Sequence, residues 1–274
     1  MDTTSPYSEQ FYLEQRDGSK SSAEVLVPLV IDLIRPCSVV DVGCGVGTWL
    51  SVFKQHGVAN VLGIDGAYVD KGMLLIDAPE FTARDLSKEF HIGRTFDLVL
   101  SLEVAEHLPE DSVEHFVSTL TQLGSAILFS AAIPFQGGTE HKTERWPDFW
   151  AQHFVNKGYA VFDPFRKAIW DNMQVEFWYA QNILLFVRRD GLGSYPNIGR
   201  LSEVKNLARL NLVHPKQFLK AVEKREEAVR AHERTLKMYV DSRDPTKMSL
   251  GQTLALLPSL VRHAICRRLI RSRR

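Results

Sequence analysis

Three glycines alternate with other residues in the segment VVDVGCGVGTW, which spans residues 39–49. Gly43, Gly45 and Gly47 follow an apolar run that is typical of a buried strand, and an amphipathic stretch follows them. Glycine adopts positive φ and lets a ligand approach the backbone, while free N–H groups at a helix N-terminus favour electron-rich ligand atoms. Asp65 ends the next predicted strand about twenty residues later, where a carboxylate can accept hydrogen bonds from ribose hydroxyls. These residues predict a site for a ligand that contains a nucleoside.

Two further residues distinguish between the ligands that fit this geometry. A dinucleotide site prefers a small residue at the position of Thr48, because the helix must approach the strand beneath the pyrophosphate. Asp41 lies two residues before the first glycine, where it would repel a pyrophosphate but suits the ammonium and sulfonium groups of S-adenosylmethionine. The segment therefore favours S-adenosylmethionine. The alternative is that the glycines only form a tight turn between strand and helix.

The segment DVGCGVGT resembles the first motif of the class I S-adenosylmethionine-dependent methyltransferases, and further motifs of that family follow in order over about residues 20–190. The resemblance implies that Asp65 binds the ribose, that Asp85 lies beside the adenine amino group and that Leu86 offers an adjacent backbone amide. FDLVLSLEVAEHL, at 96–108, is similar to the motif that ends the fourth strand of the family. The cofactor-binding residues predicted in this way are Asp41, Gly43, Cys44, Gly45, Gly47, Trp49, Asp65, Gly66, Asp85, Leu86, Leu102 and Glu103.

A second group of polar residues is expected at the same edge of the sheet. Glu103, Glu106 and His107 follow the predicted fourth strand, and His141 lies in the loop after the fifth. These four residues are candidate metal ligands, because carboxylates and imidazoles together suit Mg²⁺, Mn²⁺ or Zn²⁺. The pattern resembles the metal-using small-RNA 2′-O-methyltransferases and, in its first half, the ubiquinone-pathway O-methyltransferases. Two alternatives remain open: the histidines act without a metal, as a base or as pocket walls, or the group is structural, with Glu106 capping the next helix.

Methyl transfer from a sulfonium requires an acceptor that is aligned with the methyl group and protected from water. A hydroxyl acceptor must also lose its proton, which requires a base or a metal ion nearby, whereas an amine needs much less help. His107 and His141, together with Glu103, are the predicted catalytic residues. Their chemical types favour O-methylation.

The acceptor is expected to meet the long segment between the last two predicted strands. Residues 163–182 are rich in aromatic and amide side chains, and an insertion of this length in a compact domain is usually functional. Together with residues 141–150 and 7–30, this segment resembles bacterial methyltransferases of surface-polysaccharide and related glycan pathways, which implies a sugar hydroxyl as acceptor. The predicted acceptor-binding residues are Glu144, Arg166, Trp170, Asn172, Trp178 and Tyr179, with Gln181 as a further polar contact. The alternative is a hydrophobic lid that packs on the sheet.

Short β-branched runs alternate with amphipathic stretches from residue 38 onward. This alternation predicts an α/β fold with a doubly wound, Rossmann-like sheet of seven strands, the last of them antiparallel. The predicted strands are 38–42, 60–65, 81–85, 96–102, 125–131, 159–163 and 182–187. The predicted helices are 21–34, 46–56, 110–122 and 147–157, and residues 200–238 are helical in pattern. The methyltransferase domain is expected over 1–190, with a helical extension over 191–274.

Charge separates the C-terminal tail from the rest of the chain. The 274 residues carry 33 basic and 33 acidic side chains, but residues 245–274 hold Lys247 and six arginines and no acidic residue. The remainder is therefore mildly acidic, which argues against a nucleic-acid partner. Val261, Ala264, Ile265 and Leu269 share one face of a predicted basic helix. Such a helix could lie on an anionic membrane, pack on an acidic protein surface or remain unattached.

The remaining features favour a cytoplasmic protein. The N-terminus has neither the basic start nor the apolar stretch of a secretory signal, and no apolar run is long enough to cross a bilayer. Cys37, Cys44 and Cys266 show neither a disulfide framework nor zinc spacing. Peripheral contact with the inner face of the membrane and formation of a homo-oligomer both remain open.

The predicted function is transfer of a methyl group from S-adenosylmethionine to a hydroxyl, on a sugar of a glycan or glycolipid precursor. Two other kinds of enzyme fit: a small-molecule or natural-product O- or N-methyltransferase, and an RNA 2′-O-methyltransferase. A non-enzymatic alternative is a cofactor-binding partner subunit whose helices recruit another enzyme.

Overall fold

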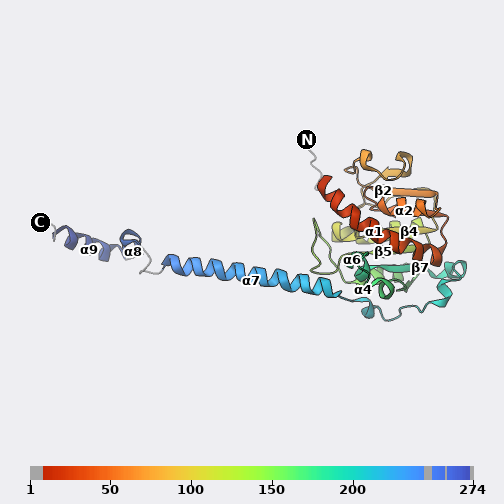
Figure 1. The fold of residues 1–274 in the computed structure, drawn as a ribbon. Coiled ribbons are helices and arrows are strands. Elements are labelled where there is room, and N and C mark those ends of the chain that lie inside the picture. The colour runs from red at the N-terminus through yellow and green to blue at the C-terminus, as the bar shows by residue number, and fades with distance from the viewer. Residues whose placement is uncertain (1–8, 244–248, 257, 272–274) are drawn as a thin grey trace. The chain divides into compact units, whose positions relative to one another are not determined.

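The computed structural model describes residues 9–243, 249–256 and 258–271, and the chain divides into two units between Phe218 and Leu219. The first unit is built on a seven-stranded sheet in the order β3-β2-β1-β4-β5-β7-β6 (Figure 1). The strands are β1 Ser38–Val42, β2 Asn60–Asp65, β3 Phe81–Ala83, β4 Leu98–Leu102, β5 Ala126–Ser130, β6 Tyr159–Phe162 and β7 Leu184–Arg188. β7 is antiparallel to both of its neighbours, and the other pairs are parallel. The predicted α/β sheet with an antiparallel last strand is confirmed.

The central strands are apolar on both faces because helices cover both sides of the sheet. Every residue of β1, β4 and β5 is buried, as expected for a parallel sheet between two helical layers. Val39 of β1 is paired with Val61 of β2 and Leu98 of β4. This register aligns the carboxyl ends of the three strands, so the residues that follow them meet at one edge of the sheet.

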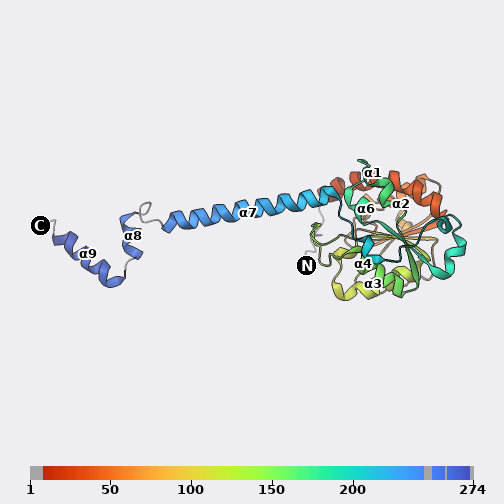
Figure 2. The same cartoon turned by 90° about the horizontal axis from the view of Figure 1, so that it is seen from below.

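The two helical layers lie on opposite faces of the sheet (Figure 2). On one face, Leu26 of α1 and Leu50 of α2 share a core cluster with Tyr179 of α6. On the other face, Phe116 of α3 and Trp150 of α4 belong to a second cluster. The helices of this unit are α1 Glu9–Ile34, α2 Thr48–Gln55, α3 Val113–Leu123, α4 Pro147–Asn156, α5 Arg166–Ile169 and α6 Phe177–Asn182. Short 3₁₀ helices cover Lys71–Met73, Ala78–Glu80, Ala105–His107, Glu110–Ser112, Arg189–Ser194, Ile198–Arg200 and Leu207–Leu210.

The N-terminal helix differs from its predicted start at residue 21, because α1 already begins at Glu9. The polar residues in this part of the sequence do not show the apolar pattern of a helix, but they make specific contacts. The Ser22 hydroxyl accepts a 2.9 Å hydrogen bond from the backbone N–H of Glu176. The Ser19 hydroxyl lies 3.1 Å from the phenol oxygen of Tyr179. Serines that would weaken an exposed helix therefore attach α1 to the segment before β7.

The C-terminal region also differs from its predicted course. Residues 200–214 form 3₁₀ turns and loops rather than a helix, and the first compact unit extends to Phe218 instead of ending near residue 190. One anchor of this stretch is the carbonyl of Leu210, which accepts a 2.7 Å hydrogen bond from the guanidinium of Arg166. Because buried polar contacts of this kind join residues far apart in sequence, local patterns do not reveal them.

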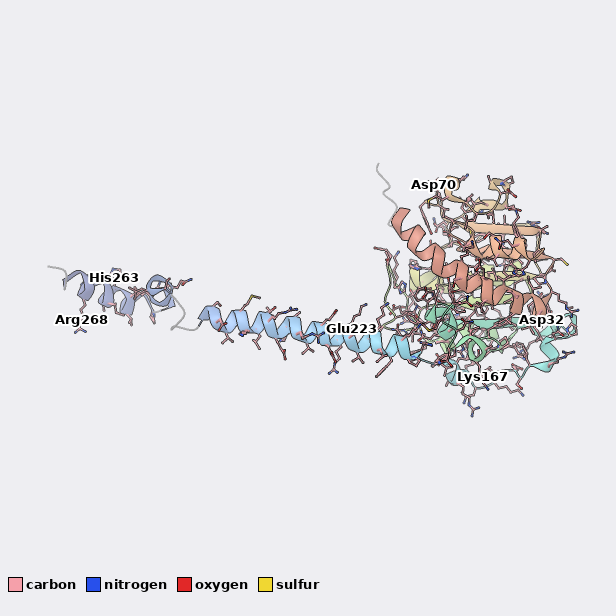
Figure 3. All side chains as sticks on the ribbon, in the orientation of Figure 1. Asp32, Asp70, Lys167, Glu223, His263 and Arg268 are labelled. Carbon is pink, nitrogen blue, oxygen red and sulfur yellow. The ribbon has the colours of Figure 1, made fainter. Side chains whose placement is uncertain are left out.

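The second unit consists of helices, beginning within α7 Pro215–Arg243 and continuing through α8 Leu250–Leu256 and α9 Ser259–Arg271. Side chains project from all round α7, among them the labelled Glu223 (Figure 3). The predicted apolar residues Val261, Ala264 and Ile265 fall within α9. The side chains of Leu269 and Arg271, and residues Lys247, Arg273 and Arg274, lie outside the described part. Among residues 9–243, 249–256 and 258–271, no helix has the length and hydrophobicity that crossing a membrane requires.

Candidate active site

A cavity of about 700 Å³ opens at the carboxyl ends of β1, β2 and β4, and the glycine loop forms part of its wall. Gly43 and Gly45 have φ values of 89° and 53°, which side chains rarely allow. A Cβ on Gly43 would lie 2.3 Å from the side chain of Val104, in the loop after β4. Glycine at this position therefore allows two strand-end loops to pack together around the cavity.

Asp65, the last residue of β2, is buried in the wall of this cavity. Its Oδ2 accepts a 2.7 Å hydrogen bond from the N–H of Gly45, and its Oδ1 accepts 2.6 Å bonds from the N–H of Gly66 and the hydroxyl of Tyr68. Burial raises the pKa of Asp65, and these three donors partly offset the shift. The carboxylate is thus held in a fixed orientation at the end of the strand, where a ribose could be bound.

Of the acidic side chains that line the cavity, Asp41 and Asp65 are buried and Glu103 is half-buried. Burial raises the pKa of Asp41 to about 7, and the neighbouring Asp65 carboxylate adds to the shift. Oδ1 of Asp41 has no hydrogen-bond partner among the described residues. Removal from water also raises the pKa of Glu103 to about 7, although hydrogen bonds from Asn182, Ser130 and Gln136 partly offset the shift. A cationic ligand would stabilise the ionised forms of all three side chains.

Two amide side chains orient Glu103. Nε2 of Gln136 donates a 2.8 Å hydrogen bond to its Oε2, and Nδ2 of Asn182 donates a 3.1 Å bond to its Oε1. The backbone of Glu103 has a φ of 55°, which is uncommon for a residue with a side chain. Strain of this kind persists where surrounding contacts over-determine a conformation, and it is concentrated at functional sites.

The second predicted group is brought together in part. Glu106, His107 and His141 each offer a candidate ligand atom, and these atoms lie within 4.8 Å of one another. Glu106 is fully buried, and neither of its carboxylate oxygens has a hydrogen-bond partner of normal geometry among the described residues. Burial, and then the charge of Glu103, raise the pKa of Glu106. The backbone N–H groups of Glu106 and Ala132 lower it only in part.

The two histidines of this group lie against each other, with ring centroids 4.8 Å apart and ring planes at 90°. Burial, and then the proximity of His141, lower the pKa of His107 to about 4, so its imidazole is neutral near pH 7. Nδ1 of His141 lies 2.9 Å from Oε1 of Glu144, which orients the second ring. Two imidazoles beside an unpaired buried carboxylate form a set of donors that suits a divalent metal ion. Glu103, which was also predicted as a ligand, is not part of this set, and two amide groups engage its carboxylate.

Comparison with known proteins identifies the family. A methyltransferase-domain model matches residues 12–165, which is more than half of the chain. The chain belongs to this methyltransferase family. It is 30% identical over 106 residues to a ubiquinone biosynthesis O-methyltransferase of Mesorhizobium japonicum, a match that covers 35% of this chain and 40% of that protein. The chain therefore matches less than half of that relative's length.

Solved structures of similar fold include methyltransferases of different kinds. Magnesium protoporphyrin IX methyltransferase from Synechocystis PCC 6803, with bound SAH, is 22% identical with a TM-score of 0.48. The alignment covers 65% of this chain and 87% of that one. An O-methyltransferase family protein from Burkholderia thailandensis is 14% identical with a TM-score of 0.44, over 67% of this chain and 63% of that one.

The cavity of the methyltransferase domain contains nearly all the predicted cofactor-binding residues. Those that line it are Asp41, Gly43, Cys44, Gly45, Trp49, Asp65, Gly66, Asp85, Leu86, Leu102 and Glu103. Gly47 does not line it and instead precedes α2 with a φ of 83°, packed against Ile76. The sequence prediction missed Ser19 and Tyr68, which also line the cavity. Both come from polar surface-like segments that carry no local signal of a site.

Of the predicted acceptor residues, Tyr179 lines the cavity of the methyltransferase domain, and its ring packs edge-on against Trp49 with centroids 5.2 Å apart. Glu144 was predicted to bind the acceptor, but its carboxylate is engaged by backbone groups. Its two carboxylate oxygens accept hydrogen bonds from the N–H groups of Phe135 and Gly137, at 2.7 and 2.8 Å. Glu144 therefore shapes the loop after β5 and orients His141.

Arg166 also differs from its predicted acceptor role, because it is fully buried. Its guanidinium donates to the carbonyls of Gln181 and Leu210 and to Oδ2 of Asp163, at 3.0, 2.7 and 2.7 Å. These bonds join α5, α6 and the segment before α7, so Arg166 stabilises the fold. Gln181 is likewise buried and donates to Oε1 of Gln136 at 3.1 Å.

The remaining three predicted acceptor residues, Trp170, Trp178 and Asn172, do not line the cavity and contact other parts of the domain. The ring of Trp170 lies 4.8 Å from that of His214, and Trp178 packs against the core cluster beneath α1. Oδ1 of Asn172 accepts a 2.9 Å hydrogen bond from the N–H of Gln174. Of the six predicted acceptor residues, Tyr179 is therefore the one that lines the cavity.

Proposed function

We propose that the domain transfers a methyl group from S-adenosylmethionine to a hydroxyl, on a sugar of a glycan or glycolipid precursor. The observation that carries the proposal is the set of three enclosed carboxyl groups, Asp41, Asp65 and Glu103, in one cavity at the carboxyl edge of the sheet. Raised pKa values mean that these groups are costly to ionise without a cation beside them. S-adenosylmethionine offers two cationic groups and a ribose, whereas a dinucleotide offers a pyrophosphate.

The three carboxyl groups would bind two different parts of the cofactor. Asp65 would accept hydrogen bonds from the ribose hydroxyls, because it ends β2 with both oxygens directed by backbone N–H groups. Asp41 and Glu103 would face the ammonium group. The cofactor supplies an activated methyl group when it is bound, so the protein has to position the acceptor and exclude water. Asp85 is held by the Ser87 hydroxyl at 2.6 Å and by Lys88, at the rim where the adenine is expected.

For the acceptor side we propose a divalent metal ion held by Glu106, His107 and His141. A base whose pKa is about 4 removes a proton from an alcohol poorly, whereas a neutral imidazole is the form that binds metal. The buried carboxylate of Glu106 has no hydrogen-bond partner of normal geometry among the described residues, and a metal ion would satisfy it. When bound, such an ion would lower the pKa of a hydroxyl beside it. His107 lines the cavity together with Glu140 and Lys142, so the acceptor would enter between these residues.

The sugar acceptor follows from the resemblance to glycan-pathway methyltransferases, and a direct assay tests it. The full chain would be incubated with methyl-labelled cofactor and separate pools of sugar nucleotides, lipid-linked saccharides, phenolic metabolites and small RNA. We expect label in a saccharide pool, at a hydroxyl. Label in the phenolic pool or in RNA would instead identify one of the two other classes of acceptor. An absence of label in all pools, despite cofactor binding, would favour a cofactor-binding partner subunit.

Binding of S-adenosylmethionine is expected to strengthen as the pH rises through 7. Asp41 and Glu103 are mostly protonated below their raised pKa values of about 7 and attract a cation only when ionised. Between about pH 6 and pH 7.5 the affinity should rise up to about tenfold for each carboxyl group that must ionise. Titration calorimetry of the wild type and of Asp41→Asn measures this change. The variant should bind more weakly and show a smaller pH dependence. An unchanged pH profile would contradict the proposal that ionised Asp41 attracts the cationic group of the cofactor.

We also propose that the basic tail attaches the protein to an anionic membrane surface. A chain that ends at residue 243 should keep its affinity for S-adenosylhomocysteine and lose association with phosphatidylserine-containing vesicles at low salt. Co-sedimentation of the two chains with vesicles measures the difference. If the full chain ignores such vesicles, the tail does not bind a membrane, and an acidic protein surface becomes the better candidate.

A further inference from the structure

The long helix α7 carries aliphatic side chains at a spacing of seven residues. Val222, Val229 and Leu236 lie one heptad apart, within a helix that spans Pro215–Arg243. A strict seven-residue repeat keeps its side chains on one face only if the helix supercoils around a partner. With these three residues at heptad position a, position d is occupied by Phe218, Arg225, His232 and Tyr239.

This face lies on a helix that is otherwise polar. Every side chain from residue 223 to residue 240 is exposed, including Val229 at 48% and Leu236 at 53%. A helix in a folded protein obtains most of its stability from packing its apolar face. Other exposed apolar side chains of α7, Leu219, Met238 and Val240, lie near its two ends, so the row at seven-residue spacing is the face that extends along the helix. A cover for the aliphatic row is therefore expected.

The charges beside the row favour a second copy of the same helix. Each of the two cationic d positions is followed directly by an acid at position e: Arg225 by Glu226, and His232 by Glu233. In a parallel pair, a d side chain inserts among residues of the facing helix that include its e position. Arg225 of one copy would then meet Glu226 of the other, and the reciprocal contact would form as well. Small residues at position g, Ala221 and Ala228, leave room for this packing.

We propose that α7 pairs with a second copy of itself as a parallel, two-stranded coiled coil. The polar d layers would define the register of the two helices. The pair would join two methyltransferase domains through their C-terminal helices. It would also place two basic tails at the same end of the coil, which strengthens attachment to any common surface without a new contact.

Sedimentation velocity of the full-length chain tests the pairing. The wild type should sediment as a species of twice the 31.1 kDa chain mass. The double substitution Val229→Glu and Leu236→Glu should give the single-chain mass, with cofactor affinity and helical content of the domain unchanged. The matched control is Ala231→Glu with Met238→Glu, which adds the same two acids at position c and should remain paired. A wild type that stays single at high concentration, or a Val229/Leu236 variant that stays paired, would overturn the proposal.

Cross-linking tests the parallel direction. In a chain whose exposed Cys37 and Cys266 are replaced by serine, cysteine would be placed at Val222 or at Leu236. In a parallel pair each of these positions faces its own copy, so both variants should form a disulfide-linked dimer on mild oxidation. An antiparallel pair cannot bring both positions to their own copies, because they lie two heptads apart. A dimer linked by only one of the two cysteines, or by neither, would overturn the parallel arrangement.

Discussion

Replacing Asp65 with alanine is expected to weaken binding of S-adenosylmethionine and S-adenosylhomocysteine by about 10²–10⁴-fold, since two charge-assisted hydrogen bonds of roughly 1.5–3 kcal/mol each would be lost. The physical reason is that Asp65 ends β2 with both oxygens fixed in the cavity wall, where they would accept hydrogen bonds from the ribose hydroxyls. Isothermal titration of the variant and the wild type measures the change.

Two controls separate this effect from unfolding. Asp32→Ala removes an exposed carboxylate from α1, labelled in Figure 3, and should leave the affinity unchanged. Asp65→Asn keeps the shape of the side chain and should show a large part of the same loss, because the charge is removed. Thermal unfolding of all three variants should show a folded domain. An unaltered affinity in both Asp65 variants would mean that the ribose is bound elsewhere.

Replacing His107 with alanine is expected to lower kcat by about 10²–10⁴-fold, because the residue contributes to the removal of the acceptor proton. Binding of S-adenosylhomocysteine should change little, since His107 packs against His141 and belongs to the proposed metal site rather than to the acids that would bind the cofactor. Steady-state kinetics and calorimetry on the same preparation separate the two effects. His56→Ala, which removes an exposed histidine after α2, is the matched control and should retain full activity.

Removal of metal ions with a chelator then distinguishes between His107 as a metal ligand and His107 as a general base. With a metal ion held by Glu106, His107 and His141, exhaustive EDTA treatment should abolish turnover of the wild type, and Mg²⁺, Mn²⁺ or Zn²⁺ should restore it. Full activity after the same treatment, combined with near-total loss in His107→Ala, would contradict the metal and identify His107 as a base. The assignment to the methyltransferase family does not depend on this result.

The sequence predicted the strands and the glycine loop beside the cavity well because their determinants are local. The glycine loop and the acid at the end of the next strand lie within about one strand–helix–strand unit, where backbone conformation and strand order follow from short patterns. The predicted strand β1 agrees with the observed Ser38–Val42, and β2 agrees with Asn60–Asp65. Periodicity therefore placed Asp41 and Asp65 correctly, and their approach to Glu103 followed from the parallel order β2-β1-β4.

The features that the sequence did not predict are side-chain contacts between segments that are distant along the chain. Gln136 and Asn182 orient Glu103 although they lie 33 and 79 residues away in sequence. Arg166 was predicted to bind the acceptor because it offers polar contacts in a segment rich in aromatic and amide side chains, but two backbone carbonyls and Asp163 engage it instead. Composition indicates that such residues are polar, but it does not indicate which other segment satisfies them.

The most direct test of the account is calorimetric titration of the full chain with S-adenosylhomocysteine and, separately, with NAD. We expect saturable binding of S-adenosylhomocysteine with one ligand per chain, lost in Asp65→Ala, and no heat of binding with NAD. The acids Asp41, Asp65 and Glu103 should admit an ammonium group and a ribose and repel a pyrophosphate. Tight binding of NAD with no response to S-adenosylhomocysteine would contradict the central claim.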